Sequence, residues 1–187
     1  MLGPLAVSAD DGASVPIRGL QMRRVLAALA VHAPEPVPVD RLDDLLWPDG
    51  PPSSNALQAI VSKLRKAVAP VARTAGGYAL TIAPEELDVH RFERLVVSGR
   101  DAAAGGDHER AARELTQALA LWRGRPYEEI ADHAIGRAPA ARLTSLRDAA
   151  LAARLETELA QAGWTRWRPR SRPSAGPSPS SSGGGPS

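Results

Sequence analysis

The sequence predicts a mainly α-helical protein with two small β-hairpins, and three features of the chain carry this prediction. Most long segments repeat apolar residues every three or four positions, which is typical of amphipathic helices. Two shorter segments flank glycine-containing turn pairs, which indicates hairpins. Aromatic residues make up only 4% of the 187 residues and cysteine is absent, so Leu, Val and Ala must form the core without disulfides.

Five elements are expected in the first half of the chain. In chain order they are a hairpin, two helices, a third helix and a second hairpin, at residues 2–19, 20–33, 40–47, 55–69 and 71–82. Asp11-Gly12 and Gly76-Gly77 are turn pairs that accept the positive φ of a tight hairpin, and Asp40 is the expected N-cap of the second helix. This order is that of a winged helix-turn-helix, in which the third helix is the recognition helix and the second hairpin is the wing.

The helix at 20–33 is expected to have an apolar side and a cationic side. Leu20, Val25 and Leu29 follow one another along one side at helical spacing. Arg23 and Arg24 fall outside that side, so we expect both guanidinium groups to face solvent.

The second half of the chain has helical periodicity only. A helix pair at 87–106 and 107–124 is interrupted by glycines, with Asp107 able to cap the second helix, and a long helix follows at 135–163. Three antiparallel helices with alanine at close-packing positions predict a tetratricopeptide-like domain. We therefore expect a winged-helix domain at 1–84 and a helical domain at 85–163.

The composition changes after Gly163. Residues 164–187 contain no Leu, Ile, Val or acid and are rich in Pro, Ser and Gly. Such a segment buries too little apolar surface to offset its chain entropy, so we expect a disordered tail. Its origin stays open between a natural flexible tail and the product of a frameshifted or truncated gene end.

The expected recognition helix has two chemically distinct faces. Leu57, Ile60, Val61, Leu64 and Val68 share an apolar sector of the helical wheel. The opposite sector carries Asn55, Gln58, Ser62, Arg65 and Lys66, with Lys63 at its border. Amides can pair bidentately with adenine, and Arg and Lys can reach guanine or phosphate. The alternative is an ordinary solvated face; such faces usually carry both charge signs, whereas no acid occurs between Asp49 and Glu85.

The sequence does not indicate an enzyme. Its four histidines are scattered without metal-ligand spacing, and no glycine-rich phosphate motif lies between a strand and a helix. We expect no catalytic residue, no cofactor and no metal. The longest apolar run is too short to span a bilayer and the N-terminus lacks the basic start of a signal peptide, so we expect a cytoplasmic protein without a membrane partner.

Several segments resemble the SARP family, the Streptomyces antibiotic regulatory proteins. They are LGPLAV, VDRLDDLLWPDGPP, NALQAIVSKLRKAV and GGYAL in the first half, and LDVHRFERLVVSGRDAAAGG, AARELTQALALWRG and YEEIAD in the second. The resemblance covers residues 1 to about 163 and implies an OmpR-like winged helix followed by a bacterial transcriptional activation domain. It further implies a nucleoid-associated activator that binds direct repeats near promoters, as a homodimer on the DNA, recruits RNA polymerase holoenzyme and controls a secondary-metabolite gene cluster.

Two sets of site residues follow. The expected contacts with double-stranded DNA are Asn55, Gln58, Ser62, Lys63, Arg65 and Lys66 from the helix and Arg73, Thr74 and Tyr78 from the wing. For Tyr78, packing of the ring under the hairpin remains an equal alternative. By the family resemblance, the loop before the helix faces the polymerase through Pro48, Asp49, Pro51, Pro52 and Ser53. The rival reading is a helical protein-interaction module, or a truncated regulator whose DNA binding is vestigial or does not activate.

Overall fold

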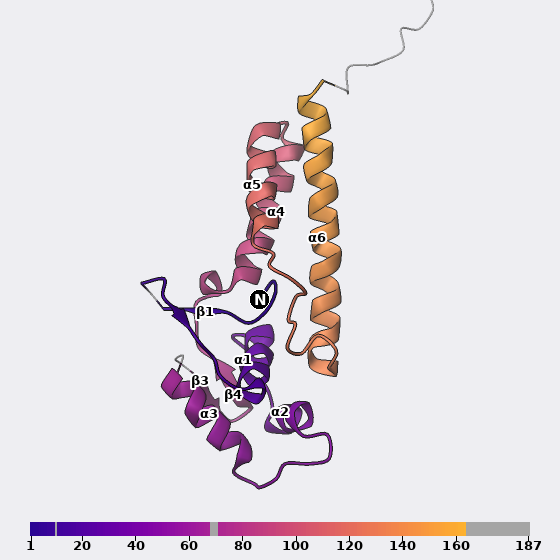
Figure 1. Cartoon of the computed structure of the whole chain (residues 1–187). Coiled ribbons are helices and arrows are strands. Elements are labelled where there is room, and N and C mark those ends of the chain that lie inside the picture. The colour runs from indigo at the N-terminus through magenta and orange to yellow at the C-terminus, as the bar shows by residue number, and fades with distance from the viewer. Residues whose placement is uncertain (10, 68–70, 164–187) are drawn as a thin grey trace, which may run out of the picture.

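The structure is a computed structural model that describes residues 1–9, 11–67 and 71–163. In the first half two antiparallel two-stranded hairpins flank three consecutive helices, and helices alone follow (Figure 1). The elements are β1 (Val7–Ser8), β2 (Ser14–Val15), α1 (Leu20–His32), α2 (Val39–Leu46), α3 (Ala56–Ala67), β3 (Val71–Thr74), β4 (Gly77–Leu80), the short 3₁₀ helix η1 (Pro84–Glu86), α4 (Asp88–Ala104), α5 (His108–Ala120) and α6 (Ala134–Gln161). The predicted order and class of the elements are therefore confirmed, and the tail expected at 164–187 lies outside the described residues.

In the first half, α1, α2 and α3 pack around one apolar core with the hairpin β3–β4 against α1. Val37, in the link between α1 and α2, exchanges two backbone hydrogen bonds with Tyr78: the Val37 N–H donates to the Tyr78 carbonyl over 2.8 Å and the Tyr78 N–H donates to the Val37 carbonyl over 3.0 Å. The link thus extends the small sheet by one pair. This close approach requires glycine next to it, because a Cβ at Gly77, whose φ is +135°, would lie 2.0 Å from the Val37 carbonyl oxygen.

Three local expectations in this half were wrong. α2 begins one residue earlier than expected, after Pro38, so Asp40 lies in the first turn and is not the cap; proline already has the φ of a helix entry. The wing turns at Ala75-Gly76, because Gly77 is the first residue of β4 and pairs with Thr74. Leu20 is 56% exposed, since it is the first residue of α1 and lies beyond the core.

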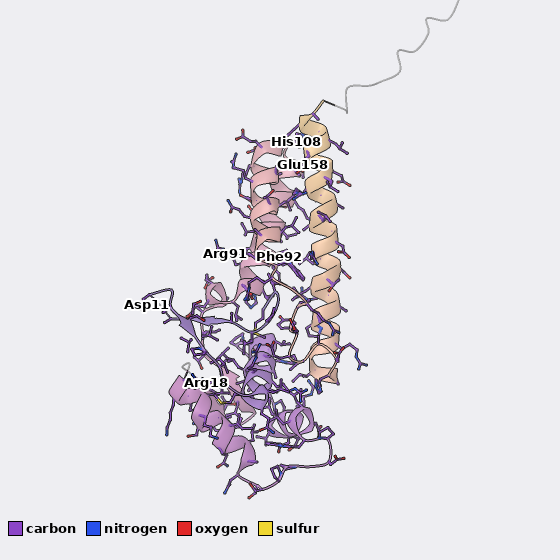
Figure 2. The ribbon with its side chains drawn as sticks, viewed as in Figure 1. Asp11, Arg18, Arg91, Phe92, His108 and Glu158 are labelled. Carbon is purple, nitrogen blue, oxygen red and sulfur yellow. The ribbon has the colours of Figure 1, made fainter. Side chains whose placement is uncertain are left out.

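In the second half, α4, α5 and α6 run side by side, and α5 packs against both of the others (Figure 1). The Asp107 carboxylate accepts a hydrogen bond of 3.0 Å from the Arg110 N–H, which confirms the predicted cap of α5. Gly99 lets α4 and α5 approach closely, because a Cβ there would lie 2.8 Å from the Leu115 side chain. The fully buried ring of Phe92, labelled in Figure 2, packs edge-to-face on Trp122 with centroids 5.4 Å apart.

The start of the chain joins the two halves. Met1 and Leu2 are buried, and their carbonyl oxygens accept hydrogen bonds from the backbone N–H groups of Tyr127 and Arg123, over 3.1 and 2.7 Å. Asp88, the first residue of α4, pairs with the Met1 amine over 2.6 Å. Burial alone would raise the pKa of Asp88, but the amine, the Leu2 N–H and Arg123 outweigh burial and hold that pKa below its ordinary value.

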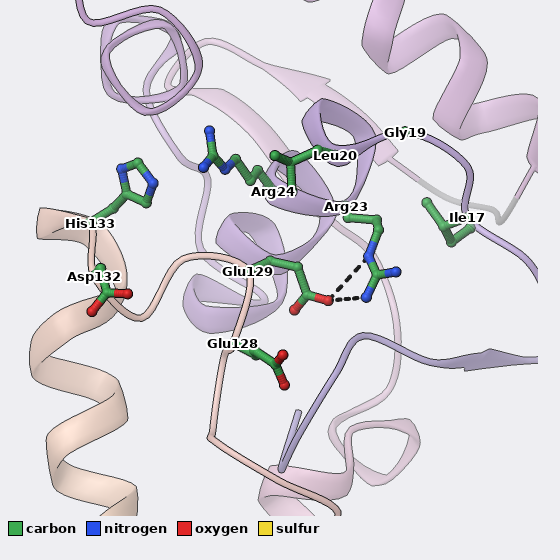
Figure 3. Close-up of a pocket in the computed structure, with 9 residues that line it drawn as sticks. All are labelled: Ile17, Gly19, Leu20, Arg23, Arg24, Glu128, Glu129, Asp132 and His133. Atoms are coloured by element: carbon green, nitrogen blue, oxygen red, sulfur yellow. Dashed lines mark hydrogen bonds and ion pairs between the residues drawn. The ribbon is translucent and has the colours of Figure 1, made fainter.

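A partly buried ion pair makes a second joint between the halves. Arg23 of α1 was expected to face solvent, but its guanidinium pairs with the Glu129 carboxylate in the segment before α6 (Figure 3). The same Glu129 oxygen accepts a hydrogen bond of 2.8 Å from the Leu5 N–H. The expectation for Arg23 was wrong because its partner is 106 residues away in the sequence, beyond the reach of helical periodicity.

Candidate nucleic-acid interface

The helix α3 has the two faces that its sequence predicts. Leu57, Ile60, Val61 and Leu64 are buried against the core, with exposed fractions between 1% and 8%. The side chains of Gln58, Ala59, Ser62, Lys63, Arg65 and Lys66 are exposed. Small side chains at Ala59 and Ser62 leave the middle of this face low, which lets a helix sit deep in a major groove. The exposed face thus combines an amide, a hydroxyl and the long cationic side chains of lysine and arginine, and it carries no acid.

Asn55 lies directly before α3 and is exposed. Its carbonyl oxygen accepts the first helical hydrogen bond, 3.0 Å from the Ala59 N–H, so its backbone is fixed at the helix start. Its amide therefore stands at the end of the helix that, in helix-turn-helix proteins, contacts base edges. Asn55 and Gln58 are three residues apart, which places both near one side of the helix.

The loop between α2 and α3 is exposed throughout the residues expected to face a polymerase. These are Pro48, Asp49, Pro51, Pro52 and Ser53. The half-buried Trp47 packs against the core at the start of the loop, and its carbonyl oxygen accepts a hydrogen bond of 2.9 Å from the Gly50 N–H. The loop is thereby held at one end and leaves its prolines and Asp49 in solvent, at the end of the molecule away from the end of α6 (Figure 1).

The wing presents two of its three expected contact residues. Arg73 and Thr74 are exposed at the end of β3, whereas Tyr78 is only 4% exposed. Tyr78 is therefore packed in the core, as the alternative prediction held. β4 is covered along its whole length, so the alternation of inward and outward side chains that a hairpin suggests does not bring Tyr78 to the surface.

Two contacts at this surface were not foreseen from the sequence. The Arg73 guanidinium lies over the Tyr78 ring, 4.7 Å from its centroid, and the Arg73 Nη1 donates a hydrogen bond of 2.9 Å to the Tyr78 hydroxyl. The Arg65 Nε donates a hydrogen bond of 2.7 Å to the Val71 carbonyl, which links the last turn of α3 to the start of the wing. Arg65 thus connects α3 to the β3–β4 hairpin, a contact that its position on the helical wheel does not predict.

Neither a metal site nor a membrane span is found in the described part of the chain. Among residues 1–9, 11–67 and 71–163, no three His, Asp or Glu side chains gather as metal ligands would. Within the same ranges, every helix is too short or too polar to cross a membrane.

Comparison with known proteins points to one class. Residues 87–173 match the family described as the bacterial transcriptional activator domain. The chain is 37% identical over 175 residues to the regulatory protein DnrI of Streptomyces peucetius, a match that covers 85% of this chain and 64% of that protein. It is 34% identical over 170 residues to the transcriptional regulatory protein EmbR of Mycobacterium tuberculosis, covering 86% and 44% of the two chains. The chain thus spans less than two thirds of the length of these relatives.

A solved structure agrees with the sequence matches. The structure of Mycobacterium tuberculosis EmbR in complex with a low affinity phosphopeptide superposes with a TM-score of 0.77 at 35% identity, over 86% of this chain and 45% of that one. EmbR is named as a transcriptional regulatory protein, and its structure shares with this chain a winged-helix part followed by a helical part. The chain is therefore similar to transcriptional regulators of the SARP family over most of its own length.

Proposed function

We propose that this regulator binds double-stranded DNA in a sequence-specific manner through α3 and the wing. The observation that carries the proposal is the exposed face of α3, which joins the amide of Gln58 to the cations of Lys63, Arg65 and Lys66 without an acid. Arg73 extends this cationic surface onto the adjacent hairpin. An acid-free cationic surface attracts a polyanion, and its amides supply groups that distinguish bases.

Within this surface, the proposed roles divide along the helix. Asn55 and Gln58 lie at the N-terminal end, which enters the groove in helix-turn-helix proteins, so they read base edges. Lys66 and Arg65 lie in the last turn and hold phosphates, as Lys63 does from the border of the face. Ser62 lies between the two groups and contributes through its small size and its hydroxyl.

Gln58→Ala and Lys66→Ala separate these two roles. Gln58→Ala should lose about 1–3 kcal/mol against the preferred site and relax discrimination at one base pair. Lys66→Ala should weaken binding to all sequences alike and lower the slope of log affinity against log salt by about 1. Each variant is measured by fluorescence anisotropy on promoter DNA from next to its own gene and on a scrambled duplex of equal composition, at several salt concentrations.

A matched control is Arg113→Ala, which removes an exposed cation from α5 and should leave both affinity and salt slope unchanged. If Gln58→Ala and Lys66→Ala also behave like this control, the polar face of α3 contacts only water and the proposal fails. Absence of any salt-dependent DNA binding by the unaltered protein would favour the reading as a protein-interaction module instead.

We further propose that the loop between α2 and α3 meets RNA polymerase holoenzyme while α3 occupies the DNA. Support comes from its exposure, from its anchoring at Trp47 and from its position beside the recognition helix. A loop held at one end next to the DNA surface can reach a neighbouring protein on the same promoter without releasing the groove. Pro48, Pro51, Pro52 and Ser53 shape the loop, and Asp49 supplies its charge.

Asp49→Ala should separate activation from binding. We expect transcript yield in a reconstituted run-off assay to fall about three- to tenfold, the effect of losing one charge-assisted contact, while DNA affinity stays unchanged. Asp101→Ala, which removes an exposed acid from α4, is the control and should leave both quantities unchanged. A fall in DNA affinity that accounts for the lost transcription would contradict the assignment of the loop to polymerase.

The remaining proposals concern the arrangement on the promoter. Residues 1–84 form the DNA-binding unit and residues 85–163 the helical activator unit, and two copies bind a direct repeat side by side. The regulated genes belong to a secondary-metabolite cluster. Footprinting on promoters next to its own gene tests the last two statements. A direct repeat must appear as two protected stretches that contain the same sequence in the same orientation.

A further inference from the structure

Arg73 and Tyr78 form a cross-strand pair in the wing, and the position of Tyr78 in the core sets the geometry of the pair. They are direct partners in the β3–β4 register. The backbone N–H and carbonyl of Tyr78 both form hydrogen bonds with Val37, which lies on the side of β4 away from β3. Arg73 and Tyr78 therefore form a non-hydrogen-bonded pair, the kind in which opposing side chains come closest.

The tyrosine side of the pair is packed in the core. Its ring is only 4% exposed and belongs to the apolar core, and its backbone is held by the two Val37 hydrogen bonds. Gly77, directly before it, leaves no room for movement toward the link, since even a Cβ would meet the Val37 carbonyl. Contact with this packed ring therefore restricts the orientation of the Arg73 guanidinium.

The arginine side of the pair remains presented to solvent. Arg73 is exposed, and its guanidinium carbon lies over the ring, 4.7 Å from the centroid, with one hydrogen bond from Nη1 to the Tyr78 hydroxyl. A guanidinium carries five N–H donors, so this bond uses only one of them. Stacking on a ring face leaves the edge of the guanidinium, with its donors, as the part that can meet a phosphate or a base.

We propose that Tyr78 is a positioning residue that holds the Arg73 guanidinium in its DNA-binding orientation before DNA arrives. The inference rests on the proposed DNA binding and deepens it, because it assigns a DNA-recognition part to a buried residue that touches no DNA. An unrestrained arginine loses rotamer freedom when it binds, whereas one already ordered does not, so the pair raises affinity by preorganisation.

A double-mutant cycle tests this coupling in the full chain. Tyr78→Phe keeps the ring in the core and removes only the hydroxyl, so it should weaken binding about three- to tenfold in the presence of Arg73. The same change made in an Arg73→Ala background should cost almost nothing, because there is no guanidinium left to orient. The probes are the labelled promoter duplex and the scrambled duplex described above, and the unfolding midpoint of each variant is recorded in parallel.

The slope of log affinity against log salt gives a second measurement. A purely structural role of Tyr78 would not produce the following differences between the variants. Arg73→Ala should lower the slope by about 1 if the guanidinium meets a phosphate, whereas Tyr78→Phe should leave the slope unchanged because the charge remains. An equal loss in both backgrounds would mean that Tyr78 acts through hairpin stability, and no loss in either would mean that the pair does not matter; each result overturns the inference. If the unaltered protein binds DNA, the proposed function survives such a result, whereas absence of binding by the unaltered protein removes both.

Discussion

Leu64→Ala should lower the free energy of unfolding by about 2–5 kcal/mol, because it opens a cavity under the recognition helix. Leu64 is 1% exposed and lies on the face of α3 that packs into the core of the winged-helix half. Helices of this length are marginal on their own, so α3 depends on this packing to exist as a helix. Urea unfolding followed by far-ultraviolet circular dichroism measures the change.

The control for this variant is the adjacent residue in the sequence. Lys63→Ala removes an exposed side chain from the border of the polar face of α3 and should change the unfolding free energy by less than about 0.5 kcal/mol. The pair of variants separates stability from recognition, since Lys63 is proposed to contact DNA and Leu64 is not. Equal unfolding free energies for the two variants would show that α3 does not pack as described.

Glu129→Ala should cost about 2–4 kcal/mol of unfolding free energy, because it removes one side of the buried joint between the two halves. The Glu129 side chain is 4% exposed, and its Oε1 accepts from Arg23 and from the Leu5 N–H (Figure 3). Removal leaves a partly buried cation and a backbone donor without their acceptor. The Arg23 side chain is 35% exposed, so water recovers part of the loss and the cost stays below that of a fully buried pair.

A matched control lies in the same segment. Arg125 and Asp132 form an ion pair of 2.7 Å whose side chains are 54% and 80% exposed. Asp132→Ala should therefore change the unfolding free energy by about 0–1 kcal/mol. Glu129→Gln is the informative intermediate, because it keeps an acceptor for the Leu5 N–H and loses only the charge. If Asp132→Ala lowers the unfolding free energy as much as Glu129→Ala does, the Arg23–Glu129 pair contributes no more to stability than an exposed ion pair.

The joint connects the cores of the two halves. The hydrophobic cluster of the winged-helix half continues into residues of the helical half, and Met1 and Leu2 are inserted between the two. The helix α6 of the second half contacts α1, which in turn packs directly on α3. The proposed division at residue 84 separates the chemistry of the two units but cuts through a shared core.

The sequence by itself determined the local architecture of this protein. Apolar spacing placed the helices, turn residues placed both hairpins, and Asp107 capped α5 as its position predicted. The two faces of α3 also followed from the sequence, because helical periodicity decides which side chains share a side once one side is buried. Similarity to the SARP family was likewise visible in short segments, since these carry both the core pattern and the polar face.

The tertiary structure alone decided what the polar side chains touch. Arg23 pairs with Glu129, Arg65 reaches the Val71 carbonyl, and Tyr78 lies in the core beneath Arg73. Periodicity constrains only residues within a turn or a strand of one another, whereas these contacts depend on how separate elements are brought together. A long polar side chain at the edge of a buried surface takes the nearest available partner, and that partner is fixed by packing between elements rather than by the local pattern of residues.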